Sequence, residues 1–168
     1  MDEIQITGHQ TPTAEALLRS RPHEFFSVFL CSPGCTPAPQ LFALSNGAIR
    51  IEFDDVDRFN SQHICPDASH VLLALHATDD KAKVMFACHA GLSRSAGMAL
   101  VIAAKHWGLG RAFSILKPGY HHPSRQIVAV GAEVIDVPEL WTRFVDWYKA
   151  VYHSDPSAGW VPCRGAAG

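Results

Sequence analysis

Cys88 and Arg94 are the two residues of this sequence whose types and spacing could do chemistry together. They stand six positions apart in the segment Cys88-His-Ala-Gly-Leu-Ser-Arg94-Ser95. A cysteine thiolate is a nucleophile, and a helix N-terminus and a nearby guanidinium should both favour the thiolate over the thiol. The guanidinium is a planar fork of N–H donors that fits two phosphate oxygens and keeps its charge. The pair therefore indicates nucleophilic attack on a phosphate-like anion.

The residues around this segment predict how it is held. Residues 84–87 form a short apolar run typical of a strand buried on both faces, and residues 95–107 form a helical stretch that ends at Gly108. A strand that turns into a helix leaves backbone N–H groups unpaired, and these groups favour a bound anion. Gly91 lets the turn close, and Ser95 can donate its hydroxyl to the sulfur.

The spacing of cysteine and arginine alone is weak evidence. With five cysteines in the chain, such a pair would arise by chance in roughly one comparable sequence in four or five. The alternative is a buried structural cysteine with an unrelated surface arginine nearby. The strand before the pair and the helix after it are what favour the chemical interpretation.

The segment from Cys88 to Ser95, which we term the signature loop, resembles the signature loop of the cysteine-dependent protein tyrosine phosphatase superfamily. The motif Ala-Gly-x-Ser-Arg-Ser within this loop is most similar to that of the compact dual-specificity branch and related small bacterial phosphatases. The resemblance implies that Cys88 is a nucleophile that forms a cysteinyl-phosphate, that Arg94 clamps the phosphate and that Ser95 aids breakdown of the intermediate. It also implies a phosphate cradle made by His89, Ala90, Gly91, Leu92, Ser93 and Arg94.

The sequence departs from the family pattern at two positions. Ala87 stands where the family usually has a histidine that helps hold the loop and keep the thiol acidic. Ser124 stands where small members often have an asparagine, after a proline and before a helix. The loop also lacks the lysines that inositol-lipid phosphatases of the superfamily tend to carry. The resemblance therefore implies phosphotyrosine, with or without phosphoserine and phosphothreonine, as substrate rather than a polyphosphorylated lipid or an RNA 5′ end.

A group of carboxylates follows a predicted strand upstream of the loop. Residues 49–53 alternate apolar and polar side chains, which predicts a strand with one buried face, and Asp54, Asp55 and Asp57 come at its end. A carboxylate here could protonate a leaving oxygen and then activate water. Small members of the family place their general acid at a similar point. We select Asp55, because Asp54 continues the alternation and Asp55 is the first residue of the loop. The alternatives are Asp54, Asp57, or acids that only solvate the strand end or cap the next helix.

The remaining patterns predict the elements around the loop. We expect an edge strand over residues 3–7, a helix from Pro12 with Thr11 as its cap, a strand over residues 25–31 and an irregular connection near Pro37 and Pro39. Further segments predict helices over 68–76, 110–116, from 123 onward and over 138–152, and an exposed turn over 120–123. The sum is an α/β fold with a central, mainly parallel sheet of four or five strands, helices on both faces and the loop at the carboxyl edge.

Length and composition are those of one domain. The chain has 168 residues, of which 48% are hydrophobic, enough for one ordinary core. We expect a catalytic domain over residues 1–153 and a flexible tail over 154–168, which is rich in proline, glycine, serine and alanine.

Charge and cysteine content restrict the partners. A net charge of -2 gives no basic field for nucleic acid or for a membrane surface. Acidic residues at the start are unlike a secretory signal, no apolar run reaches the length of a membrane span, and five irregularly spaced cysteines are no disulfide framework. We expect a cytoplasmic monomer acting on a phosphorylated protein or a small phosphomonoester.

No cofactor is expected. Cys31, Cys35, His121 and His122 could be proposed as metal ligands, but their spacing matches no standard site. Arg94 and the backbone amides would supply the electrostatic stabilisation that a metal ion gives elsewhere.

Three functions fit these patterns. The first is a phosphomonoesterase in which Cys88 takes the phosphoryl group, Asp55 protonates the leaving group and water then releases phosphate. The second is a catalytically impaired module that binds phosphate or a phosphoprotein through the same cradle. The third is a sulfurtransferase, because rhodanese-like proteins use a cysteine in a similar strand, loop and helix.

Overall fold

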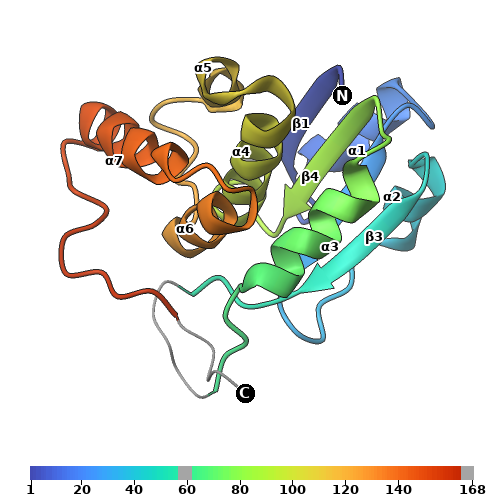
Figure 1. Ribbon diagram of the computed structural model, residues 1–168. Coiled ribbons are helices and arrows are strands. Elements are labelled where there is room, and N and C mark those ends of the chain that lie inside the picture. The colour runs from blue at the N-terminus through green and yellow to red at the C-terminus, as the bar shows by residue number, and fades with distance from the viewer. Residues whose placement is uncertain (57–61, 164–168) are drawn as a thin grey trace.

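A four-stranded sheet forms the centre of the computed structural model, which describes residues 1–56 and 62–163 (Figure 1). The strands are β1 (Glu3–Gly8), β2 (Phe26–Cys31), β3 (Ala48–Glu52) and β4 (Lys83–Cys88). They lie in the order β1-β4-β2-β3, and each neighbouring pair is parallel. The predicted α/β class with a parallel sheet is confirmed, and β1 is the edge strand that its weak alternation predicted.

Helices cover both faces of this sheet (Figure 1). They are α1 (Pro12–Ser20), α2 (Pro39–Leu44), α3 (Ala68–Thr78), α4 (Arg94–Trp107), α5 (Leu109–Ala112), α6 (Arg125–Val134) and α7 (Glu139–Tyr152), with a short 3-10 helix, η1 (Phe113–Ile115). The smaller core cluster joins α1 and α2 to one face, and the larger cluster joins α3, α4, α6 and α7 to the other. None of the helices in the described part of the chain is both long and apolar enough to cross a membrane.

Strand β4 is buried on both faces, as its apolar run predicts. Met85 and Ala87 pack into the smaller cluster, whereas Val84, Phe86 and Cys88 belong to the larger one. Successive side chains of a strand point to opposite faces. This alternation places Cys88 on the face that α4 covers.

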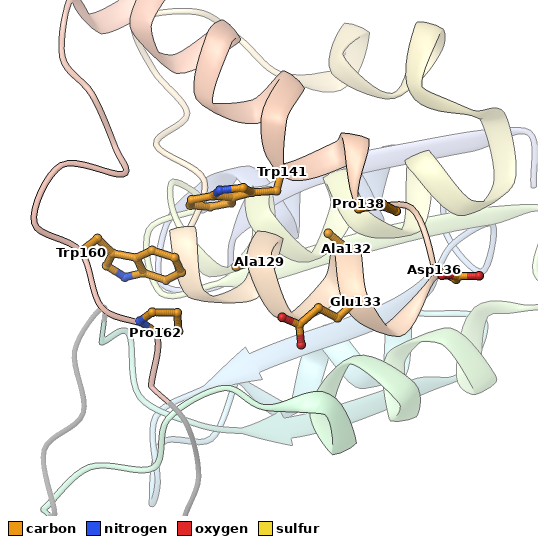
Figure 2. A pocket seen from close by; sticks show the side chains of 8 residues that line it. All are labelled: Ala129, Ala132, Glu133, Asp136, Pro138, Trp141, Trp160 and Pro162. Atoms are coloured by element: carbon orange, nitrogen blue, oxygen red, sulfur yellow. The ribbon is translucent and has the colours of Figure 1, made fainter.

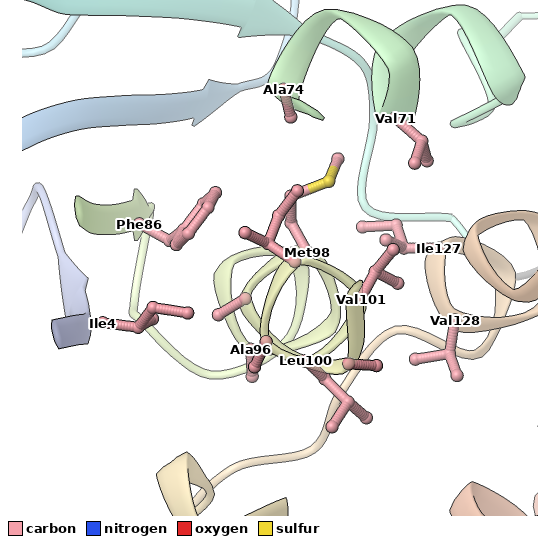
Figure 3. Close-up of a cluster of buried hydrophobic side chains, with 14 of the residues drawn as sticks. Ile4, Val71, Ala74, Phe86, Ala96, Met98, Leu100, Val101, Ile127 and Val128 are labelled. Carbon is pink, nitrogen blue, oxygen red and sulfur yellow. The ribbon is translucent and has the colours of Figure 1, made fainter. Parts of the chain in front are cut away.

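Helix α4 is the centre of the larger cluster. Eleven of its fourteen residues are buried, as expected for a helix that is apolar around most of its circumference. Figure 3 shows α4 surrounded by side chains from three directions: Phe86 of the sheet, Val71 of α3, and Ile127 and Val128 of α6. Because its first residue is Arg94, the packing of α4 fixes one end of the signature loop.

Two local predictions were wrong in part. Residues 39–44 form α2 instead of an irregular connection, because Pro39 lies in the first turn, where its missing N–H costs no hydrogen bond. Thr11 is the N-cap residue of α1, but its side chain caps no backbone N–H. Its hydroxyl donates to the Gly8 carbonyl at 2.8 Å instead.

Residues 154–163, which we term the C-terminal strap, pack on α6 and α7. The Trp160 ring stacks on Trp141 with 4.9 Å between centroids. The fully buried side-chain amide of Gln126 donates to the Cys163 and Pro66 carbonyls at 2.9 and 3.2 Å and accepts from the Cys163 N–H at 2.9 Å. Gln126 therefore ties the strap to the segment that follows the predicted acid. Residues 164–168 lie outside the described residues.

Replacing Gln126 with methionine should lower the free energy of unfolding by about 3 kcal/mol, because the N–H and the carbonyl of Cys163 lose a buried partner. For a chain of this length the Tm would fall by about 6 to 12 °C. Thermal and urea unfolding measure the change. Gln40→Met is the matched control at an exposed position of α2, where a change within about 0.5 kcal/mol is expected. Equal stability of the two variants would contradict the assigned role.

Candidate active site

The signature loop rests on the end of β1. Gly91 has a φ of 78°, and a Cβ there would lie 2.5 Å from the carbonyl carbon of Thr7. A Cβ on Gly8 would lie 2.7 Å from the carbonyl carbon of Ala90. The His9 N–H donates to the Cys88 carbonyl at 2.8 Å. Only glycine allows both the left-handed turn and this close approach of two backbones.

Cys88 lies at the base of a cavity of about 420 Å³. Its side chain is 2% exposed, and its Sγ lies 3.2 Å from the Oγ of Ser95 in the first turn of α4. At this distance the hydroxyl can donate to the sulfur, as the sequence predicts. The other residues lining the cavity are Asp55, His89, Ala90, Leu92, Ser93, Arg94 and His122. Of the predicted site residues, Gly91 and Ser95 alone are not in its lining.

Arg94 is held from one side by the neighbouring strand ends. Its Nη1 donates to the Phe53 carbonyl and to the Ser32 hydroxyl, each at 3.1 Å. Its buried Nε has no hydrogen-bond partner among the described residues and lies 3.8 Å from Asp55 Oδ2. A buried unpaired N–H on a cation is unusual in proteins. It suits an anion bound in the adjoining cavity.

The structure separates the candidate carboxylates. Asp55 accepts from the Ser93 hydroxyl at 2.8 Å and lines the same cavity as Cys88. Asp54 instead accepts from the Ile64 N–H at 3.0 Å, so its carboxylate serves the connection that follows. Asp57 lies outside the described residues. Of the two carboxylates that can be compared, the one selected from sequence lines the same cavity as the cysteine.

Solved structures match the chain along most of its length, although no family model and no curated protein matches its sequence. PTPMT1 in complex with PI(5)P is 14% identical, with a TM-score of 0.55, over 84% of this chain and 94% of that one. The human tyrosine phosphatase-like serine/threonine/tyrosine-interacting protein is 14% identical, with a TM-score of 0.53, over 90% and 93% of the two chains. A mutant form of Tk-PTP is also 14% identical, with a TM-score of 0.50, over 85% and 91%.

The chain has the protein tyrosine phosphatase fold. The resemblance in sequence covers the eight residues from Cys88 to Ser95, whereas the likeness in fold extends over more than four fifths of the chain. The family resemblance is therefore confirmed for the architecture. The roles of individual residues in this phosphatase fold depend on the geometry of the site.

His122 is a residue of the cavity that the sequence reasoning missed. Its backbone N–H donates to the Leu92 carbonyl at 3.0 Å, and its exposed ring stacks on Tyr152 at 4.2 Å. The predicted exposed turn holds for His122 but not for His121, which is 2% exposed and accepts at Nδ1 from the Lys117 N–H at 3.0 Å. Burial lowers the pKa of His121 to about 4. The two consecutive histidines before Pro123 are the sequence signal that could have identified His122 as part of the cavity lining in this phosphatase fold.

His9 also lies beside the loop, next to the position where the family pattern is broken. Ala87 is fully buried in the smaller cluster, so its side chain points away from the cavity. The His9 ring lies 6.3 Å from the His89 ring, and its Nδ1 is buried without a partner among the described residues. Burial above all, and also the charges of His89 and Arg94, lower the pKa of His9. The imidazole of His9, the residue that follows β1, thus lies beside the signature loop in this phosphatase fold.

Cys31, another buried cysteine, lies on the opposite face of the sheet. Burial, with a contribution from Cys35, raises the pKa of Cys31 to about 11, so its thiol stays protonated and unreactive near neutral pH. Within residues 1–56 and 62–163, no group of three or more His, Cys, Asp and Glu side chains could hold a metal ion. Cys88 is the cysteine that the phosphatase fold places on a cavity with a cation and a carboxylate.

Proposed function

We propose that this protein is a phosphomonoesterase that hydrolyses phosphotyrosine, with or without phosphoserine and phosphothreonine, through a cysteinyl-phosphate intermediate. One observation carries the proposal: Cys88, Arg94 and Asp55, from two segments far apart in the sequence, line one cavity. The tyrosine phosphatase fold supports it, because the solved neighbours include phosphatases.

In the first step the Cys88 thiolate attacks phosphorus, and the bond from phosphorus to the leaving oxygen breaks. Asp55 gives its proton to that oxygen, so the product leaves as a neutral phenol or alcohol. Arg94 and the free N–H groups at the start of α4 bind the equatorial oxygens, where the charge is spread in the transition state.

In the second step water attacks the cysteinyl-phosphate. Asp55, now ionised, takes a proton from the water, and the bond between sulfur and phosphorus breaks. Ser95 can donate its hydroxyl to the departing thiolate, because its Oγ lies 3.2 Å from the sulfur. Phosphate then leaves and Asp55 is again protonated for the next cycle.

Hydrolysis of para-nitrophenyl phosphate from about pH 5 to about pH 8, with a chelator present, tests the proposal. Phosphotyrosine and phosphothreonine peptides, PI(5)P and thiosulfate complete the panel, since one neighbour was crystallised with PI(5)P. We expect turnover of the aryl phosphate and the phosphotyrosine peptide. Vanadate binding without turnover would indicate the binding module, turnover of thiosulfate alone a sulfurtransferase, and preference for PI(5)P a lipid phosphatase.

Replacing Asp55 with asparagine should lower kcat by about a hundredfold for phenyl phosphate, because the amide cannot protonate the leaving oxygen. The loss should shrink for aryl phosphates whose phenols are more acidic, since these leave without a proton. Steady-state kinetics over a series of aryl phosphates measures this dependence. If Asp55 had a purely structural role, its replacement would lower kcat by the same factor for all substrates.

Asp54→Asn is the matched control, and it should change kcat less than about fivefold, because Asp54 accepts from the Ile64 N–H and does not line the cavity. If Asp54→Asn showed the dependence on the leaving group and Asp55→Asn did not, the assignment would be reversed. Asp57→Asn completes the series, because that residue lies outside the described residues.

A further inference from the structure

Two cavities lie on either side of Glu133 on α6, away from the Cys88 cavity. The first, of about 540 Å³, is bounded by α6, the start of α7 and the C-terminal strap (Figure 2). The second, of about 400 Å³, continues along α6 toward Asp67. Ala129, Glu133 and Pro162 line both cavities. We term the two together the α6 groove, and none of its described lining residues also lines the Cys88 cavity.

Aromatic rings form one wall of the α6 groove. Trp141 comes from α7 and Trp160 from the strap, and Figure 2 shows the two indoles together opposite Ala129 and Glu133. They stack with an interplanar angle of 29°. Indole rings attract cations, and arginine guanidinium in particular stacks on them.

The charged side chains that line the α6 groove are all acidic among the residues that the structure describes. Glu133 and Asp136 are exposed carboxylates that line the first cavity. In the described ranges, neither forms an ion pair, and no lysine or arginine lines either cavity. Asp67, in the second cavity, caps α3 through the N–H groups of Ser69 and His70. A cation is therefore the complement of this groove.

We propose that the α6 groove binds a basic segment of a partner protein. An arginine or lysine side chain would lie against the tryptophans with its charge at Glu133 and Asp136. The segment on either side of it would follow the groove into the second cavity. Two cavities in series along one helix fit an extended chain better than a single small cation. Since the described linings of the groove and the Cys88 cavity have no residue in common, a bound segment leaves the phosphate site open.

Titration of the full chain with a blocked peptide of alternating glycine and arginine tests the proposal. The matched peptide carries citrulline, which has the shape of arginine without its charge. We expect saturable binding of the arginine peptide by calorimetry and about tenfold weaker binding of the citrulline peptide. In NMR spectra the indole N–H signals of Trp141 and Trp160 should shift, whereas that of Trp107, bonded to the Met1 carbonyl, should not.

Glu133→Gln together with Asp136→Asn should weaken binding of the arginine peptide about tenfold. Asp2→Asn together with Asp79→Asn removes two exposed carboxylates elsewhere and is the matched control. Equal binding by both double variants, or equal affinity for both peptides, would overturn the proposal. Equal affinity for free arginine amide would indicate a site for a small cation and would also overturn it. These results do not depend on turnover, so they stand apart from the proposed function.

Discussion

Replacing Cys88 with serine should lower kcat for aryl phosphate hydrolysis by about ten-thousandfold or more, while vanadate still binds. A serine hydroxyl of nearly the same size fits the buried position beside Ser95, and Arg94 and the loop remain to hold the anion. A hydroxyl without a base to take its proton is a poor nucleophile, whereas a cysteine is readily ionised. The variant should therefore separate binding from chemistry.

Two measurements check the Cys88→Ser prediction. Steady-state kinetics gives the loss of kcat, and mass spectrometry after acid quenching should find phosphate on Cys88 in the wild type and none in the variant. Cys35→Ser is the matched control, because Cys35 does not line the cavity, and it should keep wild-type kinetics. Turnover by Cys88→Ser within about tenfold of the wild type would mean that another residue is the nucleophile.

Replacing Arg94 with lysine should lower kcat/KM by about a thousandfold. The guanidinium is oriented by the Phe53 carbonyl and the Ser32 hydroxyl, which leaves its remaining N–H donors for two phosphate oxygens. Lysine keeps the positive charge but concentrates it on one ammonium nitrogen, so its side chain cannot bind both phosphate oxygens from this position. The loss should be larger in kcat than in phosphate affinity, because the fork is best matched to the transition state.

Kinetics and vanadate inhibition of Arg94→Lys should be measured beside its unfolding temperature, because Arg94 is 5% exposed and also contributes to folding. Arg111→Lys is the matched control, since Arg111 lies over the Trp107 ring, outside the cavity. A folded Arg94→Lys variant with kcat/KM within about tenfold of the wild type would contradict the proposed role of Arg94 in binding two phosphate oxygens.

The signature loop could be predicted from sequence because its parts are consecutive. Strand β4, the turn at Gly91 and helix α4 follow one another, so local pattern alone places Cys88 beside Arg94 and Ser95. Asp55 needed one further argument, the end of the alternation at β3, and the structure places it at the Ser93 hydroxyl. Its role as general acid stays a prediction.

The rest of the site comes from packing between distant segments. The Ser32 hydroxyl and the Phe53 carbonyl, which follow the ends of β2 and β3, orient Arg94. Neither residue has a side-chain type or a spacing that would identify it as part of the site. His122 reaches the cavity because its N–H is bonded to Leu92. Such contacts depend on the crossing of α4, α6 and the sheet, which periodicity does not specify.

The position of the C-terminal strap also depends on contacts that the sequence pattern does not predict. Its composition of small residues and prolines is typical of a tail, but Trp160 and Cys163 give it partners on α7 and α6. Composition counts residue types, whereas one buried amide at Gln126 determines where this segment lies.

The strap also sets the order in which this protein can mature as it is synthesised. The described residues that line the Cys88 cavity have been made once His122 is added. The Gln126 amide must wait for Cys163 to leave the ribosome. Until then its bond to the Pro66 carbonyl is the only one of the three that can form. Domains fold during translation as their residues emerge, so an incomplete chain would leave the Gln126 amide with one of its three bonds. The C-terminal strap is therefore the last described segment to pack, after the residues that line the Cys88 cavity have been made.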